Sequence, residues 1–483
     1  MGTLLLSYLL LLLSAASFLT AEAGSVGVNY GRVANNLPTA TKVVELLKSQ
    51  GITQVKLYDA DATVLKALAG TGIHAVVTLP NEQLAAASSR LSFAISWIQH
   101  NVAAFHPSTT IRAIAVGNEV FVDPRNLTAY LIPAMRNLHS ALVRLRLDTD
   151  IKLSSPIALT ALQSSYPSSA GSFRPDLADS VIRPMLDLLR QTNSSLMVNA
   201  YPFFAYEANS DVISLDYALF RPNPGVVDAG NGLKYLSLLD AQIDAVYAAM
   251  SQLKYDDVPI VISETGWPSK GDPKETGASA ANAAAYNGNL VRRVLTGNAG
   301  TPRRPKADID VYLFALFNEN QKPGPTSERN YGLFYPNEEK VYEIDLSLNK
   351  GGVRWNEDRG KGSGGNDGSG SPEGKAGEKW CVSNAAVGRE RLQAALDYAC
   401  GEGGADCRGI QPGATCYDPN TVEAHSTFAF NSYYQKNGRV AESCDFAGAA
   451  YVVSQQPSKF SSKFFFFSSF FLKIERLGLI CPL

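Results

Sequence analysis

Two glutamates are the residues of this sequence best suited to act as a chemical pair. Glu119 follows the apolar run Ile111–Val116, and Glu264 follows the apolar run Ile260–Ser263. If both runs are buried strands, each carboxyl group lies where a strand ends and a loop begins. A protonated carboxyl group can donate its proton to a leaving oxygen, while an ionised one attacks carbon or activates water. Hydrolysis of a glycosidic bond needs such a pair.

The Asn-Glu dipeptide around the first glutamate carries little information by itself, because it occurs five times, at Asn81, Asn118, Asn318, Asn337 and Asn356. A glutamate at a strand end is more often a solvated loop residue than a catalytic group. Two such glutamates on strands that face each other, among Trp and Tyr residues, favour the catalytic interpretation instead.

The ends of the other apolar runs are rich in amides, aromatic rings and carboxylates. They are Asn29-Tyr30-Gly31, Tyr58-Asp59, Pro80-Asn81, Asn199-Ala200-Tyr201-Pro202 and Phe317-Asn318-Glu319. Amides and carboxylates can bind hydroxyl groups, and flat rings can cover the faces of a sugar. The mixture is typical of a carbohydrate site.

Eight nearly continuous apolar runs alternate with amphipathic stretches between Gly24 and residue 347. The runs are Val26–Tyr30, Gln54–Tyr58, His74–Leu79, Ile111–Val116, Ile151–Ser155, Leu196–Asn199, Ile260–Ser263 and Ile309–Phe317. Strands buried on both faces have this character. The alternation predicts an α/β fold, the (β/α)8 TIM barrel, with a doubly wound parallel sheet as the alternative. In a barrel, strands four and seven lie three apart, so Glu119 and Glu264 face each other across the mouth.

Helical patterns lie between these runs. Pro38 can open a helix whose Val43, Leu46 and Leu47 share one face. A second stripe has apolar residues three or four apart, namely Leu236, Leu239, Ile243, Val246 and Met250.

Composition excludes several classes of protein. The chain has 483 residues, a formal net charge of −2, 45% hydrophobic residues and 18% charged residues. It is too apolar for a disordered chain and too polar for a multi-span membrane protein. Without a basic excess, no nucleic-acid partner is expected. Neither H-E-x-x-H nor C-x-x-C occurs, so no metal is expected. A reaction carried out by two carboxyl groups requires no cofactor.

The N-terminus predicts export. Residues 1–23 combine a short leucine-rich run with Ala21-Glu22-Ala23, a cleavage site directly before Gly24. The run is shorter than the roughly 20 apolar residues of a membrane span. A secreted protein, extracellular or in the cell wall, is expected. Asn126 and Asn193 begin glycosylation sequons.

The cysteines predict a second domain. All six lie beyond residue 380, which is typical of a small disulfide-stapled module in an oxidising compartment. We place this module at residues 379–457. A glycine-rich linker, 348–378, precedes it, and a phenylalanine-rich tail, 458–483, follows it.

Five motifs resemble a known family. Val28–Arg32, Ala115–Glu119, Val198–Pro202, Ile262–Pro268 and Phe314–Lys322 are similar to plant β-1,3-glucanases of glycoside hydrolase family 17. The resemblance covers about residues 24–347. It implies a retaining endo-hydrolase of β-1,3-glucan, of the callose or laminarin type, in which Glu119 is the acid/base and Glu264 is the nucleophile.

The resemblance also implies roles for other residues. Asn118 would hold the substrate 2-hydroxyl, and Tyr201 would orient Glu264. Further residues expected to bind substrate are Tyr58, Asn199, Trp267 and Phe317. Glu319, Lys322 and Glu328 match a charged cluster beside the site, either functional or a structural ion-pair network.

The module resembles carbohydrate-binding module family 43. Trp380-Cys381-Val382, Tyr398-Ala399-Cys400, Phe430–Gln435 and Cys444-Asp445-Phe446 carry the likeness. It implies a mainly α fold with bridges Cys381–Cys444 and Cys400–Cys407. Trp380 and Tyr434 are expected either to stack on glucan or to form the core.

The C-terminus departs from this second family. The sixth cysteine is expected soon after Pro457, but Cys481 lies some twenty residues later, so Cys416 either lacks its usual partner or pairs with Cys481. An aberrant splice form or gene model is our leading explanation. Charges interrupt the apolar tail, so a glycolipid anchor is not supported.

Two other functions stay open. Hydrolysis of mixed-linkage β-1,3;1,4-glucan would use the same machinery. A non-catalytic protein that binds wall glucan is less favoured, because such proteins usually lose a catalytic carboxylate and both are present. We expect the protein to be a monomer and its partner to be β-1,3-glucan.

Overall fold

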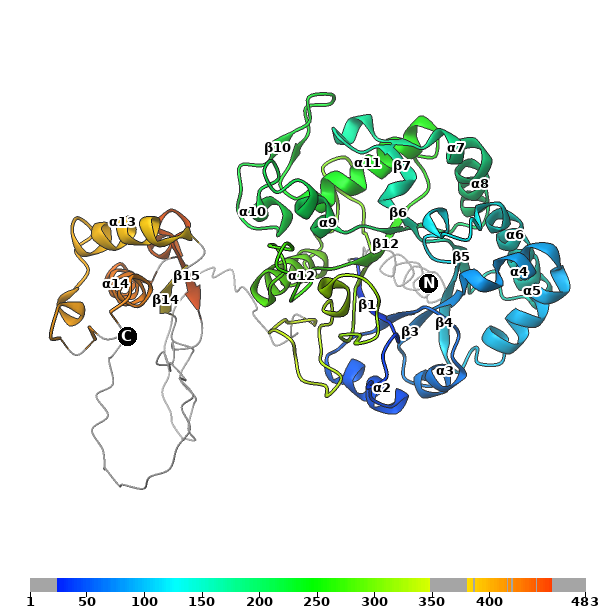
Figure 1. Cartoon of the computed structure of the whole chain (residues 1–483), viewed down its shortest axis with the longest axis horizontal. Helices are drawn as coiled ribbons and strands as arrows, with labels where there is room; N and C mark the ends of the chain where they lie inside the picture. Colours follow the sequence, from blue (N-terminus) through cyan, green and yellow to red (C-terminus); the bar gives the residue numbers. More distant parts are fainter. Residues whose placement is uncertain are drawn as a thin grey trace, which may run out of the picture. The chain divides into compact units, whose positions relative to one another are not determined.

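The computed structural model describes residues 24–347 and 380–453, apart from 385–386, 415, 418–419 and 440. The first range belongs to one compact unit and the second range to another. In the first unit, strands run through the centre and helices surround them (Figure 1).

The sheet of the first unit has nine strands, and all its strand pairs are parallel. In spatial order they are β5 (Lys152–Ser154), β4 (Thr110–Val116), β3 (His74–Leu79), β2 (Gln54–Leu57), β1 (Val26–Tyr30), β13 (Val311–Leu313), β12 (Ile260–Thr265), β9 (Leu196–Asn199) and β6 (Ile157–Ala158). Only Ser155 and Pro156 separate β5 from β6 along the chain, so the two edges of the sheet lie within about 10 Å of each other. The sheet therefore curls into a TIM barrel, as predicted, and is not a doubly wound sheet.

Three predicted strands have the bounds that the structure shows, namely β1, β3 and β9. The predicted run Ile309–Phe317 is only partly a strand, because β13 ends at Leu313. Beyond it, Ala315 N donates to Tyr331 O and Leu333 N donates to Ala315 O. The end of this run therefore bonds on two sides: Phe314 N and Leu316 N still donate to Thr265 O of β12 and Asn29 O of β1, while Ala315 pairs with a later segment.

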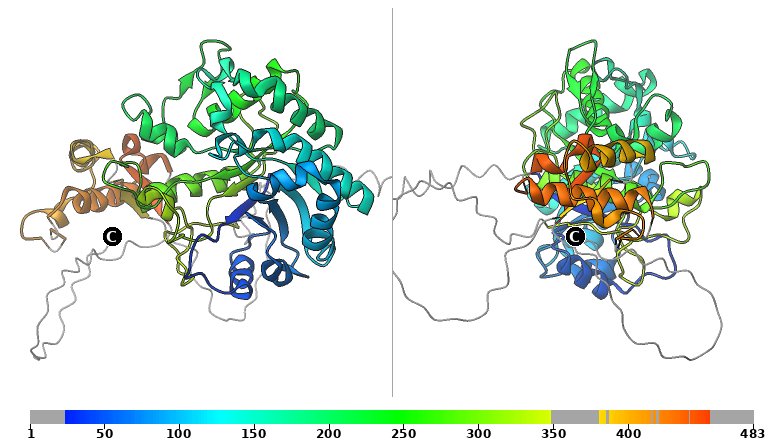
Figure 2. Two further views of the ribbon diagram at one scale, coloured as in Figure 1. Left: turned by 45° about the vertical axis from the view of Figure 1, so that its right-hand side comes forward. Right: turned by 90° about the vertical axis from the view of Figure 1, so that its left-hand side faces the viewer.

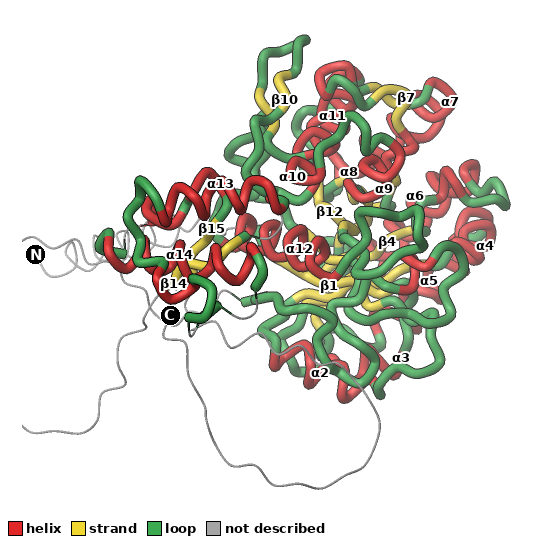
Figure 3. Tube along the Cα trace, turned by 60° about the vertical axis from the view of Figure 1, so that its left-hand side comes forward, coloured by secondary structure: helices red, strands yellow, loops and turns green. Residues whose placement is uncertain are grey.

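Helices cover the outside of the barrel (Figure 3). They are α2 (Ala40–Ser49), α3 (Ala62–Leu68), α4 (Leu84–Ser89), α5 (Leu91–Ile98), α6 (Thr128–Leu145), α7 (Pro175–Leu177), α8 (Arg183–Gln191), α9 (Pro202–Ala208), α10 (Leu215–Ala218), α11 (Leu238–Gln252) and α12 (Ala280–Leu295). The predicted helix after Pro38 is α2, and its Val43, Leu46 and Leu47 are buried as expected. The second predicted stripe is wrong at its start, because Leu236 precedes α11 and is 55% exposed.

The inside of the barrel is filled by side chains of alternating strand residues. Tyr312 Oη donates to Gln54 Oε1 at 2.7 Å. A Cβ at Gly27 would collide with the side chains of both residues. Because side chains alternate along a strand, Lys56 lies on the same inner face as Gln54, two residues closer to the mouth.

The second unit contains β14 (Trp380–Ser383), α13 (Arg389–Cys400), α14 (Val422–Lys436) and β15 (Ala450–Val453), with β14 and β15 antiparallel. In Figure 2 its helices are the orange ribbons and β15 is the red strand. The predicted bridges Cys381–Cys444 and Cys400–Cys407 are both present. Trp380 is 9% exposed and Tyr434 is 1% exposed, so both are core residues.

Several sequence predictions lie outside the described residues: the signal peptide 1–23, the linker 348–378, the tail 458–483 and Cys481 with its possible bridge to Cys416. None of the helices that the structure describes is both long enough and apolar enough to cross a membrane.

Candidate active site

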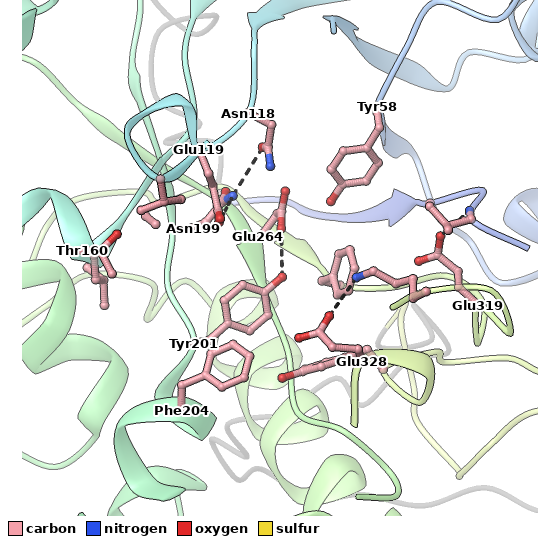
Figure 4. Close-up of a pocket in the computed structure, with 18 of the residues that line it drawn as sticks. Tyr58, Asn118, Glu119, Thr160, Asn199, Tyr201, Phe204, Glu264, Glu319 and Glu328 are labelled. Carbon is pink, nitrogen blue, oxygen red and sulfur yellow. Dashed lines mark hydrogen bonds and ion pairs between the residues drawn. The ribbon is translucent and has the colours of Figure 1, made fainter. Parts of the chain in front are cut away.

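A cavity of about 840 Å³ lies at the carboxyl ends of the barrel strands. It is lined by most of the predicted site residues, which are Tyr58, Asn118, Glu119, Asn199, Tyr201, Glu264, Glu319, Lys322 and Glu328. Other lining residues were not predicted, among them Arg32, Thr160, Phe204, Gln242, Phe314 and Tyr331. The fold thus gathers both glutamates and most of their expected partners around one space (Figure 4).

Glu119 reaches this cavity through a sharp turn after β4. Gly117 has φ +67°, and Glu119 itself has φ +50°, a left-handed conformation that costs a non-glycine residue about 1 kcal/mol. The Asn81 side chain holds the turn, since its Oδ1 accepts from Asn118 N at 2.8 Å and its Nδ2 donates to Asn118 O at 3.0 Å. Glu119 N also donates to Pro156 O at 3.0 Å.

Glu264 is brought to the cavity by an irregularity in β12. The register between β12 and β9 shifts between Ile262 and Glu264. Ser263 faces the barrel interior, where its Oγ donates to Asn199 Oδ1 at 2.7 Å. A bulge of this kind re-aims the next side chain, which lets Glu264 point inward as well.

Both carboxylate oxygens of Glu264 are held. Oε1 accepts from Lys56 Nζ at 2.8 Å. Oε2 accepts from Tyr201 Oη at 2.9 Å, as Figure 4 shows. The residue is only 5% exposed. The hydrogen bond from Tyr201 is the contact that an orienting residue would make, and its role stays a prediction. Sequence reasoning missed Lys56. A lysine inside an apolar strand was the signal that could have found it.

Glu119 has an amide partner instead of a charged one. Asn199 Nδ2 donates to Glu119 Oε1 at 2.9 Å and also lies 3.4 Å from Asn118 Oδ1. Asn199 therefore links the turn after β4 to the end of β9, and its side chain fixes Glu119 in place.

These surroundings move the two pKa values in opposite directions. Burial raises the pKa of Glu119, and the nearby charge of Glu264 raises it further, against the weaker effect of Asn199. Burial would also raise the pKa of Glu264, but the Lys56 ammonium and the hydroxyl donors of Tyr58 and Tyr201 outweigh it, so this pKa is lowered. At a pH between the two pKa values, Glu119 holds a proton while Glu264 is ionised.

The charged cluster lies on another wall of the cavity. Lys322 Nζ is 3.1 Å from Glu328 Oε2 and 4.3 Å from the centre of the Phe314 ring. Glu319 is 3% exposed, and its Oε1 accepts from Val33 N at 2.7 Å. These three residues thus form an ion pair and a loop contact while still facing the cavity.

Two predicted binding residues do not reach the cavity. Trp267 is fully buried, with its Nε1 donating to Gly277 O at 2.9 Å and its ring packed edge-on against Phe203. Phe317 is 1% exposed and packs against Tyr30. The prediction that they bind substrate is wrong, because a position near a strand end does not decide which way a side chain points. Phe204, 45% exposed and on the cavity wall, offers a ring instead.

The cavity has hydrogen-bonding groups and rings, and the described residues include no group of three or more His, Cys, Asp or Glu placed to hold a metal ion. The predicted glycosylation residues Asn126 and Asn193 are both exposed, directly before α6 and between α8 and β9. Their modification stays a prediction.

A parallel barrel with two carboxyl groups at its mouth, one favouring its protonated form and the other its ionised form, is the architecture of a glycoside hydrolase. The family model described as Glycosyl hydrolases family 17 matches residues 26–346, and the X8 domain model matches residues 379–451. The chain belongs to glycosyl hydrolase family 17.

Similar proteins agree with this membership. Glucan endo-1,3-beta-glucosidase 3 of Arabidopsis thaliana is 42% identical over 95% of this chain and 88% of that protein. Glucan endo-1,3-beta-D-glucosidase of Olea europaea is 39% identical over 93% of this chain and 95% of that protein. Among solved structures, a beta-1,3-glucanase and allergen of Cryptomeria japonica pollen is 43% identical, covers 67% of this chain and all of its own, and has a TM-score of 0.64.

Proposed function

We propose that this protein hydrolyses (1→3)-β-D-glucosidic linkages inside β-1,3-glucan chains, with retention of anomeric configuration. The observation that carries the proposal is the pair of buried carboxyl groups whose pKa values move apart within one cavity. The names of its relatives support β-1,3-glucan as the substrate.

In this mechanism the ionised Glu264 attacks the anomeric carbon, and the bond to the departing oxygen breaks as Glu119 gives that oxygen its proton. Glu119, now a carboxylate, then takes a proton from water. The water oxygen attacks the anomeric carbon, and the Glu264 carboxylate is released. Two inversions restore the original configuration. Asn118 lines the same cavity, where its amide would hold the 2-hydroxyl, and Tyr58 and Phe204 offer rings to the sugar.

Digestion of two polymers by the full-length protein tests the proposal. With linear β-1,3-glucan we expect oligosaccharides whose new reducing ends appear first as the β-anomer in NMR spectra. A solved pair of plant beta-glucan endohydrolases, with a TM-score of 0.61 and 41% identity for the match, is described as having distinct substrate specificities, so mixed-linkage glucan is the necessary comparison. Faster cleavage of mixed-linkage glucan would change the proposed substrate, and cleavage of neither polymer would refute the function.

The pH dependence should follow from the two pKa shifts. Activity requires ionised Glu264 and protonated Glu119, so kcat/KM should fall as pH drops through the lowered pKa and as it rises through the raised one. The two limbs should lie on opposite sides of pH 4.5, the ordinary pKa of both groups. Measurement of kcat/KM against pH on soluble β-1,3-glucan checks this. Tyr201→Phe removes a hydrogen bond that lowers the pKa of Glu264, so it should move mainly the acid limb to higher pH. Two limbs on the same side of pH 4.5 would contradict the assignment.

The second unit supplies a separate binding surface in this proposal. The rings of Tyr398, Tyr433 and Phe446 pack against one another at 5.1–6.5 Å between centres, and Tyr398 is 48% exposed. We call these three residues the aromatic cluster. Because Trp380 and Tyr434 are buried, the aromatic cluster is the better candidate to stack on glucan.

Replacing Tyr398 by alanine should weaken binding of the full-length protein to insoluble β-1,3-glucan by a few-fold to about tenfold, the usual contribution of one ring contact. A depletion assay measures it, using protein that also carries Glu264→Ala so that the polymer stays intact. Tyr451, 53% exposed on β15, provides a matched control in Tyr451→Ala. Equal loss in both variants would show that the aromatic cluster is not the binding surface.

Export is part of the proposed function, as the N-terminal sequence predicts. The two disulfides of the second unit support this, because such bonds persist in oxidising compartments. N-terminal sequencing of protein recovered from a plant culture medium should begin at Gly24. Retention of all the protein inside the cells would refute export.

A further inference from the structure

Lys56 is a buried charge that takes no part in the bond changes of the proposed mechanism. It lies on the inner face of β2 and is fully buried. Burying an ammonium group is strongly unfavourable unless a partner compensates it. A hydrophobic residue would fill the same position without that cost, so the charge itself calls for an explanation.

Its surroundings are specific. Nζ lies 2.8 Å from Glu264 Oε1 and 4.1 Å from the centre of the Tyr58 ring, so the cation contacts a carboxylate and an aromatic face. Lys56 is not among the residues that line the cavity. Any effect on substrate must therefore act through Glu264 and its neighbours.

We propose that Lys56 is a positioning residue that supplies a fixed positive charge in both steps of the reaction. Before attack it keeps Glu264 ionised and in place. After attack it helps to keep Glu119 ionised while Glu264 is an ester. This inference rests on the proposed function. It explains how Glu264 can react as a carboxylate in the first step and Glu119 as a carboxylate in the second.

The first step depends on the charges around Glu264. The groups that face it are Lys56 and Tyr58 from β2 and its end, Tyr201 after β9, Glu119 after β4, and Glu319 on the loop after β13. Only Lys56 among these brings a positive charge into contact with the carboxylate. Without it, burial and the neighbouring carboxyl groups would favour protonated Glu264, which cannot attack.

The second step depends on what remains after attack. Glu264 has become neutral through its bond to the anomeric carbon, and Glu119 has given its proton to the leaving group. The charge of Glu264 that raised the pKa of Glu119 is gone, while the Asn199 hydrogen bond and the charges of Lys56 and Lys322, which lower it, remain. Lys56, Glu264 and Glu119 together then carry one positive and one negative charge, as they did before, and Glu119 is ready to take a proton from water.

Two variants of the full-length protein separate charge from packing. Lys56→Met removes the charge and keeps the length of the side chain, whereas Lys56→Arg keeps the charge. In Lys56→Met, the acid limb of kcat/KM on β-1,3-glucan should move up by about one to three pH units, the usual effect of losing an opposite charge at this distance. At pH values below the acid limb, each pH unit of this shift lowers kcat/KM about tenfold. In Lys56→Arg, the acid limb should stay within about half a unit of the unsubstituted protein.

An aryl β-laminaribioside with a good leaving group tests the second step. It needs no proton from Glu119, so release of the glycosyl-enzyme limits kcat, and kcat falls at the pH where Glu119 in the intermediate becomes protonated. This limb should also move up in Lys56→Met and stay in place in Lys56→Arg.

Several outcomes would overturn the inference. A uniform loss of kcat in Lys56→Met with unmoved limbs would assign Lys56 a packing role only. Equal shifts in Lys56→Met and Lys56→Arg would show that charge is not the cause. Circular dichroism and thermal unfolding check the fold, and Lys56→Gln replaces Lys56→Met if the latter does not fold. Failure of the unsubstituted protein to cleave glucan would refute the proposed function instead, so the two failures are distinguishable.

Discussion

Replacing Glu264 by glycine should reduce hydrolysis of β-1,3-glucan by roughly four orders of magnitude or more, as loss of a covalent nucleophile does in other hydrolases. Both oxygens of this carboxylate are held, by Lys56 and Tyr201, which fixes it in the cavity. The glycine variant leaves a space at the nucleophile's position. Added azide should enter it and react with an aryl β-laminaribioside to give the α-glycosyl azide, which NMR identifies.

Glu343→Gln is the control, because Glu343 has a largely exposed side chain and does not line the cavity. It should retain full activity. A Glu264→Gly variant with a tenth of the normal activity, or one that yields the β-azide, would show that the nucleophile is misassigned.

Replacing Glu119 by alanine should have the second largest effect, a loss of about 10²–10⁴-fold on β-1,3-glucan. The reason is that an unactivated sugar oxygen leaves only when it is protonated. The rate at which an aryl β-laminaribioside with a good leaving group forms the glycosyl-enzyme should fall far less. The initial burst of released leaving group should therefore persist, while steady-state turnover slows. Azide should then give the β-glycosyl azide, because Glu264 still forms the first bond.

The basic limb of the pH profile should also disappear in this variant, since Glu119 is the group that titrates there. Glu119→Gln serves as the matched comparison, because it retains the shape of the side chain next to Asn199 without the proton. If activated and unactivated substrates lose activity equally, Glu119 is not the general acid.

Much of the site could be predicted from strand ends. In a parallel barrel every strand delivers its last residues to the same rim, so sequence position locates Glu119, Glu264, Asn199 and Tyr201 without coordinates. The same rule failed for Trp267, which belongs to the layer between strands and helices. Backbone turns after the strand, not distance from its end, decide whether a side chain enters the cavity.

Residues from different strands that act together were harder to predict. Lys56 is far from Glu264 in sequence, and only closure of the barrel brings its ammonium to the carboxylate. In the second unit the cysteine motifs predicted both bridges, because the family pattern records their pairing. Which aromatic rings are exposed there depends on how α13 and α14 pack, and the pattern does not record that.

The order of apolar runs, the motifs at their ends and the clustering of cysteines determined by themselves that this chain is a barrel hydrolase with a stapled module. Those features are local, and a periodic pattern is enough to express them. The tertiary structure alone decided the turn that aims Glu119, the bulge that aims Glu264 and the buried charge that separates their pKa values. Such effects depend on distances of a few ångströms between strands remote in sequence, where burial and Coulomb forces act most strongly.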